Sequence, residues 1–156
     1  MPSHLRSSQI RRFIPADRSR VYRTLLDPAL LAAWKVPDGM DLVVHEFDAR
    51  EGGRLRISLH YRDPASTGKT GAHTDTYHGR FLQLVPNELI VEEDHFETAD
   101  PTFAGPMKIT IHLADAPGGT ALVATHEGVP PGVALDDNDL GWNMALDKLT
   151  ALVVRP

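Results

Sequence analysis

Cysteine is absent from the sequence, and this excludes disulfides, thiolate metal sites, iron–sulfur clusters and a cysteine nucleophile. No run approaches the roughly 18 apolar residues that a transmembrane helix needs, and residues 1–6 lack the apolar segment of a signal peptide. Positive charge is not in excess either. The formal net charge of −5 gives no electrostatic reason to expect nucleic acid or an anionic membrane as a partner. These absences favour a cytoplasmic protein that does not insert into membranes.

What remains has the composition of an ordinary globular domain. Hydrophobic residues make up 42% and charged residues 24% of the 156 residues, which is enough to bury one core. The sequence has no internal repeat, no low-complexity segment and no Gly/Ser linker. We therefore expect a single domain over residues 1–156.

The first part of the chain predicts one strand followed by two short helices. Residues 5–14 alternate loosely and stop before Pro15, as an edge strand does. Apolar residues then recur at helical spacing over residues 16–26. Asp27 and Pro28 can cap and start a second helix, which we expect over residues 29–34.

After Met40 the apolar pattern changes to the period of two that is typical of strands. We expect strands over residues 42–47, 55–61, 74–85, 88–97, 107–113 and 120–127, and a long helix over residues 136–154. Short connections make neighbouring strands antiparallel. The polar segment 63–73 is expected to be a long, mobile loop.

This order of elements predicts an α+β helix-grip fold. We expect a curved antiparallel sheet of about seven strands wrapped on the long C-terminal helix, with two short helices between strands 1 and 2. A space between the sheet and this helix is where a ligand cavity can lie. The free edge of the first strand could pair with a second copy and form a homodimer.

Six short segments carry a family resemblance that spans nearly the whole chain. They are residues 14–22, 27–34, 48–54, 77–81 before Pro86, 125–128 and 141–142. In order and spacing they resemble the SRPBCC (START-like) superfamily, in the branch named after the activator of the heat-shock-protein-ninety ATPase. The resemblance implies a helix-grip fold with a hydrophobic cavity, as in lipid carriers, polyketide cyclases, hormone receptors and stress-response proteins. One departure is Lys35 after Trp34, where many relatives carry a second aromatic residue.

Aromatic residues are few, at 6%, but together with methionines they occur on every element that could line such a cavity. We single out Trp34, at the end of the second helix, and Trp142, on the first turn of the last helix, because large rings suit a pocket rim. The inward face of the strand that starts near Tyr77 stays open, since a bulge near Gly79 would change its register. The predicted ligand-binding residues are Trp34, Met40, Phe47, Ile57, Leu59, Tyr77, Phe81, Phe96, Met107, Trp142 and Leu146.

Other polar residues give weaker signals for metal or phosphate binding. No pair of histidines has the helical spacing of a metal motif. His60, on the same face as Arg56 and Ser58, is expected on the wet outer side of the sheet. Residues 68–70 (Gly-Lys-Thr) end like a phosphate-binding loop, but Asp63 stands where the first glycine is required. We therefore predict no metal and no cofactor.

Acidic residues could serve in acid–base catalysis if a buried carboxyl had a shifted pKa. The run Glu92-Glu93-Asp94 is interpreted more simply as a strand with a wet outer side. The leading hypothesis is therefore binding of a small apolar or aromatic molecule, with a carrier or stress-related role. One alternative is an enzyme of the cyclase or hydrolase type, which requires an inward carboxylate or histidine with a shifted pKa. Another is a chaperone partner, an idea taken from the family name alone.

Overall fold

The computed structural model describes residues 6–154. Leu5, the expected start of the first strand, lies outside the described residues, as does most of the N-terminal segment that we tested for a signal peptide. The elements in chain order are β1 (Ser7–Ile14), α1 (Arg18–Leu25), α2 (Leu31–Trp34), β2 (Met40–Phe47), β3 (Arg54–Tyr61), β4 (Thr74–Val85), β5 (Leu89–Phe96), β6 (Met107–Ala116), β7 (Gly119–Glu127) and α3 (Leu135–Val153).

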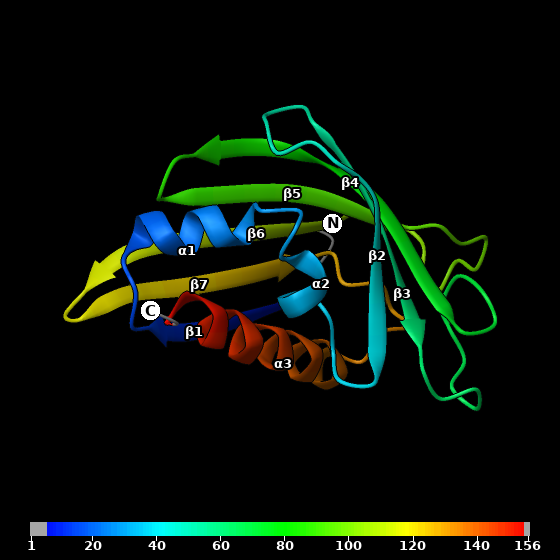
Figure 1. Cartoon of the computed structure of the whole chain (residues 1–156). Helices are drawn as coiled ribbons and strands as arrows, with labels where there is room; N and C mark the ends of the chain where they lie inside the picture. Colours follow the sequence, from blue (N-terminus) through cyan, green and yellow to red (C-terminus); the bar gives the residue numbers. More distant parts are fainter. Residues whose placement is uncertain (1–5, 155–156) are drawn as a thin grey trace.

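The strands form one seven-stranded sheet in the order β1-β7-β6-β5-β4-β3-β2, with antiparallel neighbours throughout. Strands β2 to β7 follow one another as hairpins, and β1 returns to pair with β7. The sheet is curved, and the helices lie together on one side of it (Figure 1). This arrangement confirms the predicted α+β fold class. The free edges of the sheet are β1 and β2.

Local sequence explains where the helices begin. The Asp17 side chain accepts a hydrogen bond from the Arg20 backbone N–H at 2.8 Å and so caps α1. The second helix is shorter than predicted, because the Asp27 carboxylate accepts from the Ala29 N–H at 2.9 Å and holds a turn there instead. Within the described residues, no helix is both long and apolar enough to cross a bilayer.

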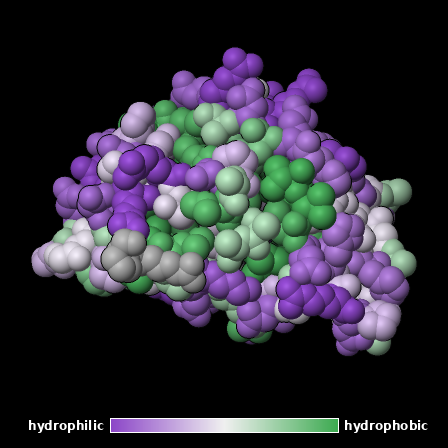
Figure 2. Space-filling view, in the orientation of Figure 1, coloured by the Kyte–Doolittle hydropathy of each residue, from purple (hydrophilic) through white to green (hydrophobic). Residues whose placement is uncertain are grey.

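The core lies between the concave face of the sheet and the helices. Leu55 and Ile57 point into it from β3, and Leu146 and Leu149 meet them from α3, all at most 1% exposed. Seen from the helix side, hydrophobic residues gather in the middle of the molecule and hydrophilic residues surround them (Figure 2). The β4 bulge lies between Phe81 and Gln83 rather than near Gly79.

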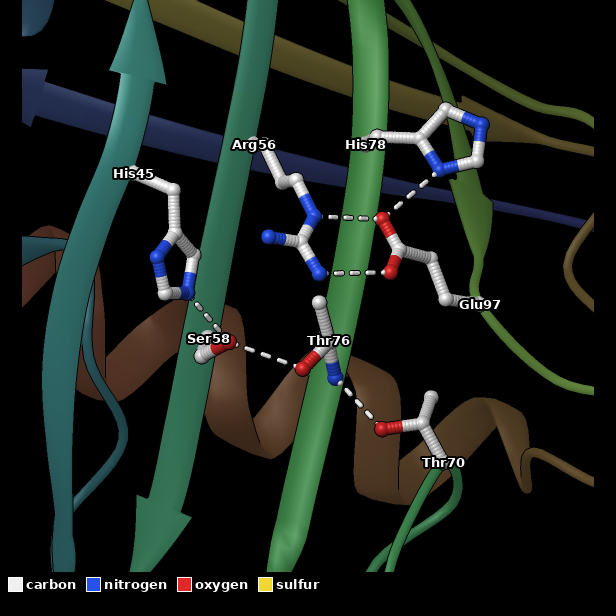
Figure 3. A network of polar contacts seen from close by, with 7 residues as sticks. All are labelled: His45, Arg56, Ser58, Thr70, Thr76, His78 and Glu97. Atoms are coloured by element: carbon white, nitrogen blue, oxygen red, sulfur yellow. Dashed lines mark hydrogen bonds and ion pairs between the residues drawn. The ribbon is translucent and has the colours of Figure 1, made fainter.

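One outer-face expectation is wrong. Ser58 is only 4% exposed, although it lies on the side of β3 opposite to the core. Its hydroxyl is 2.8 Å from Thr76 Oγ1 and 2.8 Å from His45 Nε2 (Figure 3). Thr70, from the loop between β3 and β4, accepts a hydrogen bond from the Thr76 N–H at 2.8 Å. These neighbours cover the serine, whereas His60 on the same face is exposed as expected.

Candidate functional site

A cavity of about 470 Å³ lies between the sheet and α3. This volume is within the range of sites that hold small molecules. Apolar side chains form most of its wall, from β2, β3, β5, β6 and α3. They include Met40, Leu59, Phe96, Met107, Ile109, Leu140, Met144 and Ala145. Leu140 is 56% exposed, so this part of the lining reaches solvent.

Six of the predicted ligand-binding residues line this cavity, and the structure brings them together from six elements. Trp142 is among them, although it lies about two turns into α3 rather than on its first turn. The six are Met40, Leu59, Tyr77, Phe96, Met107 and Trp142.

The other five predicted residues do not line the cavity, and for them the prediction is wrong. They pack in the core or against it instead: Trp34, Phe47, Ile57, Phe81 and Leu146. Trp34 is 1% exposed, because α2 turns its ring into the core and not toward the cavity rim. Phe47 and Phe81 make an edge-to-face contact at 5.4 Å. Periodicity identified the inward face for these residues, but it cannot show which part of that face the side chains fill.

A group of polar side chains, here called the inner polar cluster, lies at one end of the cavity and consists of Lys35, Tyr77, Glu92 and Asp94. Lys35, Tyr77 and Asp94 line the cavity. Glu92 lies beside them, with its Oε1 atom 3.4 Å from Lys35 Nζ. Glu92 and Asp94 are only 3% and 4% exposed. The interpretation of this stretch as a wet outer side is therefore wrong for both carboxyls.

The two carboxyls face inward because side chains two residues apart on a strand share a face. Glu92 and Asp94 thus accompany Phe96, which was predicted to face the cavity. Only Glu93, between them, points outward and is partly exposed. The alternation was visible in the sequence, but the charge of the residues argued against burial.

Electrostatics keep the inner polar cluster close to neutral. Burial raises the pKa of Asp94 well above its usual range, and the charge of Glu92 and a hydrogen bond to it act in the same direction. Burial lowers the pKa of Lys35, but the charge of Glu92, followed by those of Tyr77 and Asp94, outweighs it and raises that pKa overall. The arrangement thus places one ammonium between two buried carboxyls, and its surroundings favour the protonated form of Asp94. It meets the condition that we set for an enzyme, an inward carboxyl with a shifted pKa.

Gly79 makes room for this arrangement. It pairs with Asp94 across the β4–β5 ladder. A Cβ atom at this position would lie 2.2 Å from Asp94 Oδ1 and 2.2 Å from the Glu93 carbonyl oxygen. Any side chain there would push the carboxyl out of its place. The same Oδ1 atom is buried without a hydrogen-bond partner among the described residues.

His126 and Trp142 lie next to the cluster. The two rings pack at 4.7 Å, and the Lys35 Nζ atom is 6.0 Å from the centre of the Trp142 ring. Burial lowers the pKa of His126 to about 4, so the ring is neutral at ordinary pH. Its Nδ1 atom lies 2.7 Å from the Asn138 Nδ2 atom, which holds it in position. His126 packs against Trp142 but does not itself line the cavity.

A second polar group of the cavity wall, the outer polar group, is formed by Tyr61, Lys69 and Asp75. The Lys69 ammonium lies 2.9 Å from Asp75 Oδ2, and the Tyr61 hydroxyl donates to the same oxygen at 3.1 Å. The Lys69 backbone N–H donates to Asp75 Oδ1 at 2.6 Å. Lys69 thus forms an ion pair with Asp75, and these contacts hold the loop in place. The Gly-Lys-Thr segment lacks the preceding strand and the following helix of a phosphate-binding motif.

The residues that sequence reasoning missed are Lys35 and Asp94 at the inner polar cluster, and Tyr61, Lys69 and Asp75 at the outer polar group. The described part of the chain contains no group of three or more His, Asp or Glu side chains placed to hold a metal ion. The geometry defines a helix-grip protein whose mostly apolar cavity has two polar groups in its wall.

The comparisons with known proteins agree with this class. The chain belongs to the family of Activator of Hsp90 ATPase homolog 1-like proteins (AHSA1), whose model matches residues 15–154. Among curated proteins the comparison finds no match.

Several solved structures resemble the chain closely. A crystal structure of a protein from Chromobacterium violaceum is 35% identical over 100% of both chains, with a TM-score of 0.87. A protein from Rhodobacter sphaeroides is 22% identical, covers 94% of this chain and 91% of its own, and has a TM-score of 0.75. The solution structure of an AHSA1-like protein from Aeromonas hydrophila is 17% identical, with coverage of 95% and 92% and a TM-score of 0.72. The last two likenesses concern the fold alone.

Proposed function

We propose that this protein binds a small, mostly apolar molecule in the cavity between the sheet and α3. The observation that carries the proposal is the cavity itself, with a volume of about 470 Å³ and a wall built largely from methionine, leucine and aromatic side chains. Burying an apolar ligand there contributes about 25 cal/mol for each Å² removed from water. The methionines Met40, Met107 and Met144 have flexible side chains that can adapt to the shape of a ligand.

The ligand is expected to have an apolar body and a polar end. Apolar side chains such as Leu59 and Met107 lie beside polar groups of the wall, since Met107 pairs with Asp94 and Leu59 pairs with Asp75 across the sheet. A carrier role within the AHSA1 family is compatible with this design, because an apolar ligand would be shielded from water by α3.

The experiment is a titration with the neutral, environment-sensitive dye N-phenylnaphthylamine, followed by its fluorescence. We expect dye fluorescence to rise with the wild-type protein. The variant Leu59→Trp fills the cavity and should weaken dye binding by tenfold or more, about 1.4 kcal/mol. Leu82→Trp is the matched control, because Leu82 is 39% exposed and lies outside the cavity wall.

A second filling variant, Met144→Trp, together with circular dichroism of all variants, separates lost binding from lost folding. Equal dye affinity of the wild type and both filling variants would contradict the proposal.

A further inference from the structure

We propose that the inner polar cluster recognises the carbonyl oxygen of a neutral ligand, which accepts hydrogen bonds from the Lys35 ammonium and the Tyr77 hydroxyl, beside the protonated Asp94 carboxyl. This inference rests on the proposed function and names the chemical class of the ligand. It follows from the donors and acceptors that face the cavity at this end, taken one at a time.

The charge balance of the cluster comes first. One ammonium, that of Lys35, lies among two carboxyls that are at most 4% exposed. Its Nζ atom is 3.4 Å from Glu92 Oε1, so Glu92 is its counter-ion. A second buried carboxylate would have no cation of its own, which is strongly unfavourable in an apolar surrounding. Asp94 therefore keeps its proton, and the cluster as a whole is neutral.

The hydrogen-bonding capacity of the cluster comes second. Glu92 lies behind the cavity wall, and the three groups on the wall itself are an ammonium, a hydroxyl and a protonated carboxyl. An ammonium has only donors and the Tyr77 hydroxyl has a proton to donate, whereas the Asp94 proton is shared with Glu92. Among the described residues, the Tyr77 hydroxyl makes no hydrogen bond, and Asp94 Oδ1 has no partner although it is buried. The wall therefore has more donors than acceptors, and it is complementary to an oxygen acceptor.

The kind of oxygen follows from the neutrality of the cluster. An anionic group would bring a net negative charge next to the Glu92 carboxylate in a low-dielectric site, which is unfavourable. A ketone, ester or amide oxygen accepts the same hydrogen bonds without that charge. The apolar wall of Leu59, Phe96 and Met107 then holds the hydrocarbon part of the ligand.

The experiment compares three probes of similar shape: acetylnaphthalene (a ketone), ethylnaphthalene (no oxygen) and naphthoate (an anion). Isothermal titration should give the ketone about tenfold higher affinity than ethylnaphthalene, and naphthoate no advantage over it. The carbonyl stretching band of the bound ketone should move to lower frequency, as hydrogen bonding weakens the C=O bond.

Two Tyr→Phe variants test the role of the Tyr77 hydroxyl. Tyr77→Phe should lower the ketone preference about threefold and shift the carbonyl band back, while ethylnaphthalene affinity stays unchanged. Tyr22→Phe removes a hydroxyl outside the cavity wall and should leave the preference intact. Because ethylnaphthalene reports on the cavity alone, it serves as an internal control for folding in both variants.

The ketone preference should also depend on pH. The proton of Asp94 is present at low pH and is lost as pH rises through its raised pKa, so the preference should fall with rising pH. Asp94→Asn keeps a donor but does not titrate, and it should flatten this dependence. The charged or titratable groups that act on Asp94 are Lys35 at the end of α2, Tyr77 on β4, and Glu92 and Glu93 on β5. The other such groups in the cavity wall are Asp38, Tyr61, Lys69, Asp75 and Asp137.

The outcomes separate the two proposals. Binding of ethylnaphthalene with no preference for the ketone would overturn this inference and leave the proposed function in place. Tightest binding of naphthoate would overturn it as well, by assigning the cluster to anions. Failure of all three probes to bind in the cavity would contradict both proposals.

Discussion

Two carboxyl groups close together in sequence, Asp94 and Glu97, have opposite surroundings because they lie on opposite faces of the sheet. On the concave face, burial and the charge of Glu92 raise the pKa of Asp94. On the convex face, Glu97 accepts two hydrogen bonds from Arg56, at 2.8 and 2.9 Å, and lies 3.0 Å from His78 Nδ1 (Figure 3). The Arg56 hydrogen bonds, opposed by partial burial and helped by His78, lower the pKa of Glu97 to about 2.

The difference shows that the environment, and not the residue type, decides what a carboxyl does in this protein. The convex-face network of Arg56, His78 and Glu97 is hydrated and paired, so its charges are satisfied locally. The inner polar cluster is buried and has one cation for two carboxyls. Burying such groups lowers the stability of the folded protein. A cost of this kind is typical of residues that serve binding or catalysis. The three predictions that follow test this contrast, and the first has the largest expected effect.

Removing the cation of the inner polar cluster should destabilise the protein strongly. In Lys35→Met the buried Glu92 carboxylate loses its partner, and we expect a loss of about 3 kcal/mol in the free energy of unfolding. The second change in Lys35→Met/Glu92→Gln removes the orphaned charge and should restore most of this loss. Urea unfolding measures both. Arg56→Met, on the convex face, is the matched control, and an equal loss in the two single variants would break the comparison.

Replacing the neutral buried histidine should change the response of the protein to acid. The pKa of His126 falls from 6.5 to about 4 on folding, chiefly through burial. A lowered pKa means that the unfolded chain binds the proton first, so stability is present above pH 6.5 and decreases as pH falls toward 4. The slope from this group is at most about 1.4 kcal/mol per pH unit.

His126→Gln cannot titrate and keeps a polar partner for Asn138. The stability difference between wild type and variant should therefore change across that pH window. Parallel stability curves for the two proteins would contradict the role given to the buried ring.

Breaking the convex-face network should have the smallest effect. Glu97→Gln removes an ion pair whose two side chains are 44% and 29% exposed, and exposed pairs contribute about 1 kcal/mol or less. Because the pKa of Glu97 is lowered, from 4.5 to about 2, its contribution is present above pH 4.5 and is lost as pH falls through that range. Added salt should reduce the effect further. Thermal unfolding at two salt concentrations measures this, and a loss as large as that of Lys35→Met would refute it.

Much of the fold could be predicted from the sequence, because its signals are local. The strict alternation of Leu55, Ile57 and Leu59 sets the inward face of β3, and Asp17 marks the start of α1. The inward direction of the six predicted residues that line the cavity, such as Phe96 and Met107, follows from the same periodicity. The pattern did not distinguish residues that line the cavity from residues that fill the core. Trp34 and Phe81 face inward, but they are buried in the core.

The polar end of the cavity was missed for a different reason. Charged residues are rarely buried, so Glu92 and Asp94 were taken as exposed in spite of their spacing from Phe96. Only the fold reveals that Lys35, more than fifty residues earlier in the chain, forms an ion pair with Glu92. The pairing depends on how α2 packs against the sheet, and no local pattern records it.

Gly79 has a consequence for recognising this site elsewhere. The defining position on β4 is occupied by a residue with no side chain, which a search for functional groups passes over. A more informative query is a three-position rule: a glycine directly across the ladder from an acidic residue on the next strand, and a lysine just after the second helix. Chains that satisfy it would be candidates for the same kind of cavity, and a bulkier residue opposite the acid would mark those that have lost it.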